Sequence, residues 1–205
     1  FVVAMTGYAL QRKDFPYRNG IMFYIYFTSL FSAGLVPFYL LIVQTLNLRD
    51  SYLAILLPLL MSPWLIVLMK NFVKSIPHEI TESGKIDGAG DFRIFYSLVL
   101  PSLKPALATI GLFLALSYWN EWYYSSLFLT SKVEYRPLQY HLYNVINKVA
   151  SLKNSVAGSN VVITDLPGET LKMATAVVAT GPIILLYPFV QKYFVAGLTV
   201  GSVKG

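Results

Sequence analysis

Long stretches without a charged residue constrain the fold of this chain more than any other feature. The uncharged stretches are Ile21–Val43, Tyr52–Met69, Pro105–Asn120 and Met173–Val190. After Glu121 the apolar character resumes and continues to Leu129. A helix of about 20 residues spans the roughly 30 Å hydrocarbon core of a bilayer. The sequence therefore predicts an all-α, polytopic transmembrane helical bundle with spans near residues 21–43, 52–69, 105–129 and 173–190.

The overall composition supports a membrane location over a soluble one. Hydrophobic residues make up 56% of the chain and charged residues only 13%, with a mean hydropathy of +0.57. A soluble domain typically has about 25% charged residues. The net charge of +6 raises the possibility of nucleic-acid binding, but in so apolar a chain it is better explained by basic loops on the cytoplasmic side, so we expect no nucleic acid.

The first residues, Phe1–Leu10, are apolar but too short to cross a bilayer. No basic stretch precedes them and no cleavage-type sequence follows, so they do not resemble a signal peptide. We expect them to be the end of a span whose beginning is missing or truncated. The whole chain, 1–205, is then one transmembrane domain.

The distribution of basic residues predicts the orientation, because Lys and Arg concentrate in cytoplasmic loops. Placing the loop 11–20 inside also places a second polar loop, 71–103, and the C-terminus in the cytoplasm. The basic residues on this side are Arg12, Lys13, Arg18, Lys70, Lys74, Lys85, Arg93, Lys104, Lys192 and Lys204. On the opposite side lies a long segment, 130–171, with apolar patches at 138–146 and 161–163. We expect it to pack as an external cap, with a disordered loop as the alternative.

The cytoplasmic loop has the pattern of two helices joined by a glycine turn. Pro77 suits a first helical turn, and Glu79 and Glu82 fall early, where the helix dipole favours acidic residues. Gly88 permits a sharp turn, and an amphipathic stretch then leads to Pro101. A structure of this kind on the cytoplasmic face predicts a docking surface.

The same loop resembles the Glu-Ala-Ala loop of permeases in binding-protein-dependent ABC importers. The matching residues are Glu82-Ser83-Gly84, three further residues, Gly88, and later Leu100-Pro101, while Asp87-Gly88 is typical of the sugar-transporting branch. Ser83 and Gly84 depart from the alanines of the family but stay small, which leaves room for a partner. The resemblance implies a type I importer permease fold with Glu82, Ser83, Gly84, Asp87 and Gly88 coupling it to an ATPase.

The resemblance extends over the chain and implies partners. Trp119-Asn120-Glu121-Trp122 and the C-terminal run from Phe194 are similar to the maltose-type permeases of the carbohydrate branch. A second permease subunit, two cytoplasmic ATPase subunits, an external solute-binding protein, membrane lipid and an oligosaccharide substrate are implied. The sequence leaves open which sugar is carried and whether the two permeases are identical.

Residues at the end of the third long span are candidates for the translocation path. Trp119, Asn120, Glu121 and Tyr124 combine rings that stack on sugars with polar groups. The alternative for the aromatic residues, which we favour, is an interfacial belt. Glu121 binds a sugar hydroxyl or pairs with a base on another subunit. His78 and His141 have no metal-ligand companions in the sequence, so no metal site is expected.

The tail, 196–205, is rich in glycine and carries one charge, at Lys204. This composition is poor for a free helix, so we expect a flexible strip. In the permeases that it resembles, the tail contacts the ATPase pair, which implies an interface at Leu198, Thr199, Gly201 and Lys204. The alternative is a disordered end.

The sequence contains no phosphate-binding Gly-x4-Gly-Lys-Ser/Thr motif and no group of residues typical of hydrolysis. We expect no enzyme activity and no cofactor in this chain, with ATP and Mg on the partner ATPase. The interpretation is a multi-pass permease of the bacterial inner membrane that imports a sugar or oligosaccharide. The alternatives are an ABC permease for another polar solute, such as an amino acid or phosphate, and a membrane scaffold or receptor that only binds.

Overall fold

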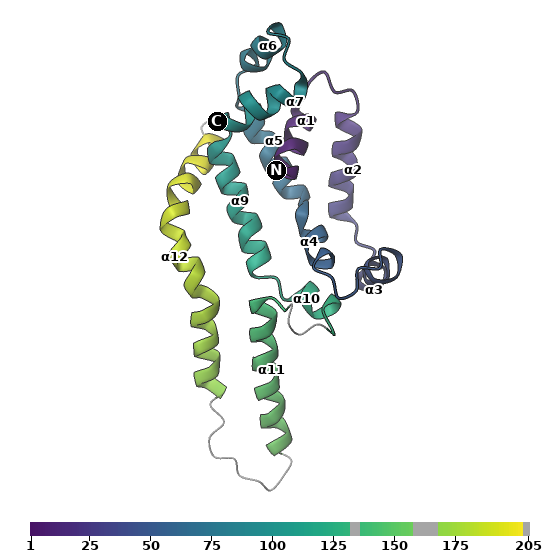
Figure 1. The fold of residues 1–205 in the computed structure, drawn as a ribbon, viewed down its shortest axis with the longest axis vertical. Coiled ribbons are helices and arrows are strands. Elements are labelled where there is room, and N and C mark those ends of the chain that lie inside the picture. The colour runs from purple at the N-terminus through teal and green to yellow at the C-terminus, as the bar shows by residue number, and fades with distance from the viewer. Residues whose placement is uncertain (132–135, 158–167, 203–205) are drawn as a thin grey trace. The chain divides into compact units, whose positions relative to one another are not determined.

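The structure is a computed structural model, and it describes residues 1–131, 136–157 and 168–202 (Figure 1). Every regular element of these residues is helical. The α-helices are α1 (Val2–Gln11), α2 (Arg18–Leu30), α3 (Leu35–Leu40), α4 (Leu53–Leu60), α5 (Pro63–Lys74), α6 (His78–Ile86), α7 (Asp91–Ile94), α8 (Leu100–Ser102), α9 (Lys104–Trp119), α10 (Tyr123–Phe128), α11 (Leu138–Ala157) and α12 (Gly168–Ser202). Two π-helical turns, η1 (Leu41–Thr45) and η2 (Phe95–Val99), continue α3 and α7.

Three of the four apolar runs form helices that are interrupted, while Met173–Val190 lies within the single helix α12. Residues 21–43 are divided by a break before α3, where Gly34 has a φ of +91°. Residues 52–69 are divided at Ser62, because Pro63 begins a new helix at α5. Residues 105–129 are divided between α9 and α10. The chain is therefore helical where apolar spans were expected, but these runs are not single straight helices.

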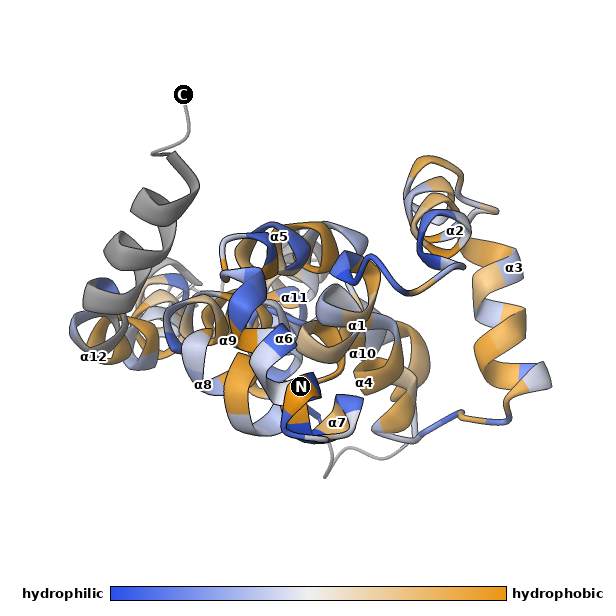
Figure 2. Cartoon of the chain, turned by 90° about the horizontal axis from the view of Figure 1, so that it is seen from above, coloured by the Kyte–Doolittle hydropathy of each residue, from blue (hydrophilic) through white to orange (hydrophobic). Residues whose placement is uncertain are grey.

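Among the described residues, no single helix combines the length and the hydropathy needed to cross a membrane. Three pairs of helices meet both requirements together, with a bend of more than 40° between their members. The pairs are Arg18–Leu30 with Leu35–Thr45, Leu53–Leu60 with Pro63–Lys74, and Asp91–Ser102 with Lys104–Trp119. Hydrophobic residues dominate α3 and α4 in Figure 2.

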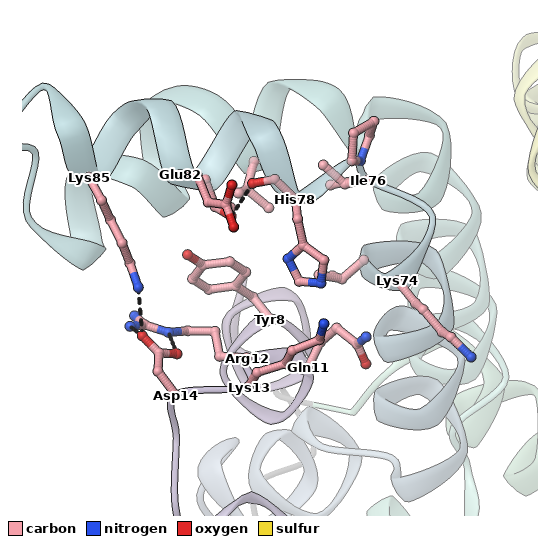
Figure 3. A pocket seen from close by; sticks show the side chains of 14 residues that line it. Tyr8, Gln11, Arg12, Lys13, Asp14, Lys74, Ile76, His78, Glu82 and Lys85 are labelled. Atoms are coloured by element: carbon pink, nitrogen blue, oxygen red, sulfur yellow. Dashed lines mark hydrogen bonds and ion pairs between the residues drawn. The ribbon is translucent and has the colours of Figure 1, made fainter.

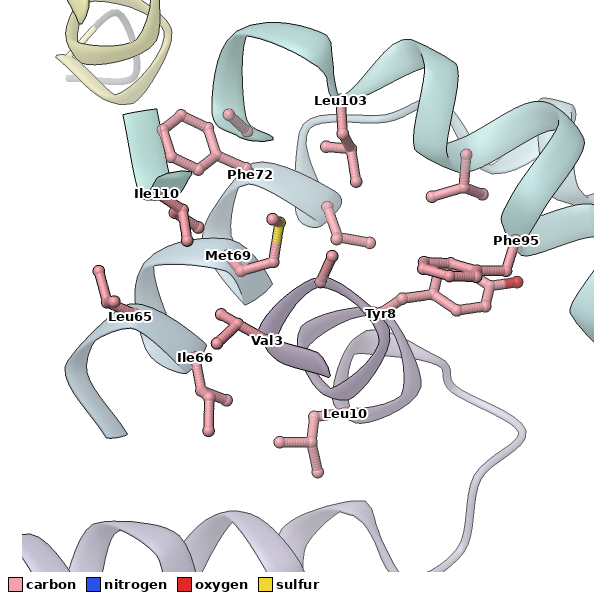
Figure 4. Packing of buried hydrophobic residues seen from close by; sticks show 14 of the residues in the cluster. Val3, Tyr8, Leu10, Leu65, Ile66, Met69, Phe72, Phe95, Leu103 and Ile110 are labelled. Atoms are coloured by element: carbon pink, nitrogen blue, oxygen red, sulfur yellow. The ribbon is translucent and has the colours of Figure 1, made fainter. Parts of the chain in front are cut away.

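The chain divides into two compact units. The first contains residues 1–38, 57–115 and 190–205, and the second contains residues 39–56 and 116–189. The core of the first unit lies where α1 packs against α5, with Val3, Tyr8, Ile66, Met69 and Phe95 among its buried residues (Figure 4). In the second unit the buried Phe128 stacks on Tyr39, with ring centroids 5.8 Å apart.

A close approach of two helices makes the first core possible. A Cβ atom added to Gly7 on α1 would lie 2.6 Å from Cγ of Met69 and 3.1 Å from the backbone nitrogen of Lys70 on α5. Real Cβ atoms essentially never come within 3.0 Å of another heavy atom. Small residues are the usual means of close helix packing in membranes, and Gly7 has this role here.

Helix α2 contrasts with the closely packed helices α1 and α5, because none of its residues is buried. Phe23, Phe27 and Phe31 follow one another at helical spacing, with ring centroids 6.0 and 4.6 Å apart. Phe23 is 69% exposed and Phe31 66%. A monomeric soluble protein rarely exposes a continuous apolar patch of this kind, so this surface agrees with a lipid or protein environment.

Two segments bear on the sequence-based expectations. Residues 138–157 form the 20-residue helix α11, so the alternative of a disordered loop is wrong for this part, while packing as an external cap stays a prediction. The spacing of Leu142, Val145, Ile146 and Val149 is the sequence signal for this helix. The apolar patch 161–163 lies outside the described residues. The expected flexible tail is wrong as far as Ser202, because α12 continues to that residue. Extending an existing helix needs no new nucleation, which compensates for the glycines.

The contact between α1 and α5 leads to a prediction about Gly7. Replacing Gly7 with Ala forces the two helices apart and should destabilise the protein by about 1–3 kcal/mol. Gly111→Ala is the matched control, because its Cβ meets nothing within 4 Å and alanine favours a helix. Thermal unfolding of the purified protein should show a lower midpoint for Gly7→Ala and an equal or higher one for Gly111→Ala. Equal midpoints for both variants would contradict the close-packing role of Gly7.

Candidate functional site

The loop 71–103 folds as the sequence predicts, into a short helix, a glycine turn and a helical return. Helix α6 ends in a Schellman motif, in which the amide of Ala89 donates to the carbonyl of Gly84 (2.9 Å) and the amide of Gly88 to that of Lys85 (3.0 Å). Gly88 has a φ of +74°, which confirms that it adopts a conformation unfavourable for residues with a side chain. Asp87 has a helical φ of −73° and ends the helix.

Gly84 faces the interior of the chain. It is buried, and an added Cβ would lie 2.9 Å from Cδ1 of Leu98 and 3.0 Å from Cγ1 of Ile94. The glycine that replaces a family alanine therefore allows α6 to lie close against the α7–η2 segment. The room expected there for a partner is occupied by this chain's own Ile94 and Leu98.

The opposite face of α6 is exposed and has a mixed character. Glu79, Glu82, Ser83 and Ile86 recur at helical spacing on this face, and all four are exposed. Ile86 is 85% exposed, which is unusual for a large aliphatic side chain on a helix this polar. We call these four residues the outer face of α6.

An ion-pair network ties α6 and α7 to the C-terminal end of α1 (Figure 3). Arg12 bonds both oxygens of Asp14, with 2.8 Å from Nε to Oδ1, and reaches Oδ1 of Asp91 at 2.7 Å. Nζ of Lys85 lies 2.8 Å from Oδ2 of the same Asp14. Hydrogen bonds from Arg12 and Lys85 hold the pKa of the Asp14 carboxyl well below its usual range. Asp14 and Asp91 in turn raise the pKa of Arg12.

The partial exposure of these side chains limits the energy of the network. Arg12 is 21% exposed, but Asp14, Lys85 and Asp91 are 44%, 51% and 61% exposed. Ion pairs at such positions contribute about 0–1 kcal/mol each. The network therefore orients α6 on the end of α1 more than it stabilises the fold.

A cavity of about 520 Å³ lies beneath the inner side of α6. Its wall is made by the end of α1, the end of α5 and the first turns of α6, and Figure 3 shows the ring of Tyr8 facing it, with His78 and Glu82 above. The cations Lys13 and Lys74 line it together with the network of Arg12, Asp14 and Lys85. Glu82 thus borders both the cavity and the outer face.

The candidate path residues lie together at the break between α9 and α10. The indole Nε1–H of Trp119 donates to the carbonyl of Ala179 at 2.9 Å. Asn120 is exposed and Tyr124 is half-buried, with its ring against Phe128. The cavity described above is lined by none of these residues, and their place on a sugar path stays a prediction.

Glu121 has a local role that the sequence did not suggest. It is buried, and its Oε1 accepts hydrogen bonds from the backbone amides of Tyr124 and Ser125, at the start of α10. A carboxylate at this place satisfies orphan amides of the first turn. Sugar binding and pairing with another subunit both stay predictions. In either case the carboxylate of Glu121 would also have to keep its hydrogen bonds to the backbone amides.

The tail residues lie at the edge of what the structure describes. The backbone of Leu198, Thr199 and Gly201 belongs to α12, while Lys204 lies outside the described residues. Their proposed contact with an ATPase stays a prediction.

Sequence reasoning missed the network of Arg12, Asp14, Lys85 and Asp91. It treated Arg12 and Lys85 only as charges that set the orientation. No local signal connects Asp14 to Lys85, which lies 71 residues further along the chain. Only the packing of α1 against α5 and η2 brings them together.

These features together define a helical membrane component with an exposed loop held between two apolar segments. A family model described as "Binding-protein-dependent transport system inner membrane component" matches residues 3–200. The chain belongs to this family of inner membrane transport components.

Known relatives agree with this assignment. The chain is 40% identical to the polygalacturonan/rhamnogalacturonan transport system permease protein YtcP of Bacillus subtilis, over 100% of this chain and 71% of that protein. It is 30% identical to the arabinooligosaccharides transport system permease protein AraQ of the same organism, over 100% of this chain and 67% of that protein. A solved bacterial ABC transporter involved in the import of the acidic polysaccharide alginate contains a similar chain, with 33% identity and a TM-score of 0.78, covering 94% of this chain and 67% of that one.

The turn after α6 leads to a prediction about its two glycines. Gly88→Ala should destabilise the protein by about 1–2 kcal/mol, because an alanine in the left-handed region is strained. Gly90→Ala is the control, since Gly90 has a φ of −66° and open space around it. Thermal unfolding of both variants tests this, and equal losses would show that the sign of φ does not matter here.

The network leads to a prediction about pH. The pKa of Asp14 is lower in the folded protein than its ordinary value of about 3.9. Its stabilising contribution is therefore present above about pH 4 and is lost as the pH falls through the folded pKa. Between pH 8 and pH 5 the mobility of α6 should stay constant, whereas Asp14→Asn should increase it at every pH.

The measurement is the electron paramagnetic resonance spectrum of a spin label at Ile86→Cys. The chain has no native cysteine, so the label is unique. Asp87→Asn is the control, because this exposed residue is on the same segment but outside the network. A label equally mobile in Asp14→Asn and in the unmodified background would show that the network does not restrain α6.

Proposed function

We propose that the chain is the permease subunit of a bacterial ATP-driven importer and that it translocates a sugar or oligosaccharide. An external solute-binding protein delivers the substrate, and two cytoplasmic ATPase subunits and a second permease complete the assembly. In this proposal the loops 11–20 and 71–103 and the C-terminus are cytoplasmic. ATP and Mg bind to the ATPase and not to this chain.

The outer face of α6 is the observation that carries the proposal. It presents the exposed Ile86 beside Glu79 and Glu82 on a helix whose other side is packed against Ile94 and Leu98 and tied through Lys85 to Asp14. A rigid, exposed apolar side chain flanked by charges is typical of the anchor of a protein interface. The acidic neighbours favour a groove with basic residues, which we assign to the ATPase.

The substrate class is supported by the relatives. Both permeases named above serve polysaccharide or oligosaccharide transport by name, and the solved transporter imports alginate. We propose that this chain carries a substrate of the same carbohydrate class. Leu198, Thr199 and Gly201, which belong to the helix α12 instead of a flexible strip, are proposed to reach the ATPase pair. Lys204, outside the described residues, is proposed to do the same.

Reconstitution tests the function. The permease is placed in proteoliposomes with its partner permease, the ATPase and the binding protein, and uptake of labelled oligosaccharides is measured with and without ATP. ATP-dependent accumulation of an oligosaccharide supports the proposal. Binding without uptake would favour a scaffold or receptor, and uptake of amino acids or phosphate alone would reject the sugar branch.

A charge reversal on the outer face of α6 tests the docking surface. Glu82→Lys should weaken association with the ATPase at least tenfold, about 1.4 kcal/mol, because it places like charges together at the interface. Asn71→Lys introduces a lysine at an exposed position of α5, a change of one charge unit instead of two, and should leave association unchanged. Association is measured by co-purification of the ATPase from membranes, with insertion of each variant as a second readout. Unchanged association in Glu82→Lys would place the docking surface elsewhere.

A further inference from the structure

Two neighbouring aromatic residues at the end of α9 donate hydrogen bonds to the backbones of two other helices. The hydroxyl of Tyr118 donates to the carbonyl of Leu56 on α4 at 2.8 Å. The indole of Trp119 donates to the carbonyl of Ala179 on α12 at 2.9 Å. All four residues belong to the same compact unit.

Both acceptor carbonyls lie within one turn before a proline. Leu56 precedes Pro58 inside α4, and Ala179 precedes Pro182 inside α12. A proline inside a helix lacks an amide donor, so the carbonyl four residues before it loses its partner, which is the carbonyl of Ala54 for Pro58 and that of Val178 for Pro182. Tyr118 and Trp119 do not replace these lost bonds. They bond to the carbonyls of Leu56 and Ala179, one or two residues further along, and so hold the helix segments next to the two prolines.

These contacts give the two aromatic residues a role other than a belt or a stacking surface. In an interfacial belt the polar tip of Tyr or Trp faces water or headgroups. Here the single N–H of Trp119 is used on Ala179, and the hydroxyl of Tyr118 on Leu56. Trp122, by contrast, stacks on Tyr143 of α11 with ring centroids 4.3 Å apart. Its described contact is therefore ring packing, unlike the hydrogen bonds of Tyr118 and Trp119.

The position of α9 in the chain connects these contacts to the docking loop. α9 begins at Lys104, immediately after α8 completes the return of the loop, and ends at Trp119. Its 16 residues make a rod of about 24 Å, at 1.5 Å per residue. Tyr118 and Trp119 thus occupy the far end of the helix that the docking loop leads into.

We propose that Tyr118 and Trp119 are positioning residues that tie the proline-containing helices α4 and α12 to the end of α9. A displacement of the docking loop is then delivered through α9 to both helices together. The prolines supply the flexible points, and the two hydrogen bonds determine which segments move with α9. This inference rests on the proposed transport function.

The test uses Tyr118→Phe, Trp119→Phe and the double variant, which keep the rings and remove the donors. Each single variant should lower the oligosaccharide transported per ATP hydrolysed about two- to threefold, the effect expected from losing one interhelical hydrogen bond in a membrane. ATPase association should be unchanged. Tyr26→Phe and Trp64→Phe are the controls, because both residues are exposed and no hydrogen bond involves either side chain among the contacts described. Equal transport per ATP in variants and controls would overturn the proposal.

Amide hydrogen exchange of the reconstituted complex gives an independent readout. Exchange should accelerate in residues 53–60 for Tyr118→Phe and in residues 175–185 for Trp119→Phe, with no change in α6. Unchanged exchange in both segments would show that the hydrogen bonds do not restrain these helices. If the unmodified complex transports no oligosaccharide, the proposed function fails, while the exchange measurement still decides whether the ties exist.

Discussion

The rest of the first unit depends on the close crossing of α1 and α5. Gly7 lets the backbones approach until Met69 and Lys70 fill the space where a side chain would stand. That crossing brings Val3 and Tyr8 against Ile66 and Met69, and it leaves a surface on which Phe95, Val99 and Leu103 complete the core. A larger residue at Gly7 would separate the helices, and the segment that follows the docking loop would lose the surface on which it packs.

The loop 71–103 is held from two sides. On the apolar side, Gly84 lies against Ile94 and Leu98, and Ile94 is itself part of the core. On the polar side, Arg12 and Lys85 converge on Asp14. The apolar contact supplies most of the stability, since ion pairs this exposed contribute little. The polar contact determines the direction in which α6 presents its outer face. In the proposed function, a loop held in this way passes a displacement on to the helices that it joins.

The other apolar helices are broken or weakened at a few defined positions. Gly34, Ser62-Pro63 and the turn at Asn120 divide the apolar runs, and Pro58 and Pro182 weaken helices from within. Side chains hold the chain near several of these breaks. Glu121 satisfies amides at the start of α10, and Tyr118 and Trp119 bond to carbonyls in the segments next to the prolines. In a low-dielectric environment an unpaired peptide group is costly. Where a long apolar helix is broken there, groups from neighbouring segments must therefore hydrogen-bond its free backbone groups.

The sequence by itself determined the helical class, the apolar segments and the glycine turn of the loop 71–103. These follow from local physics: a charge-free run favours a helix in lipid, and only glycine adopts the φ of Gly88 without strain. Gly34 and Pro63 mark two of the bends that divide the runs, but the angle of each bend and the continuation of α12 to Ser202 depend on packing. The tertiary structure alone decided which partners meet. Asp14 and Lys85, Gly7 and Met69, or Trp119 and Ala179 are far apart in the chain, and they come together because α1, α5, η2 and α9 have only a few ways to pack their apolar faces without burying an unpaired polar group.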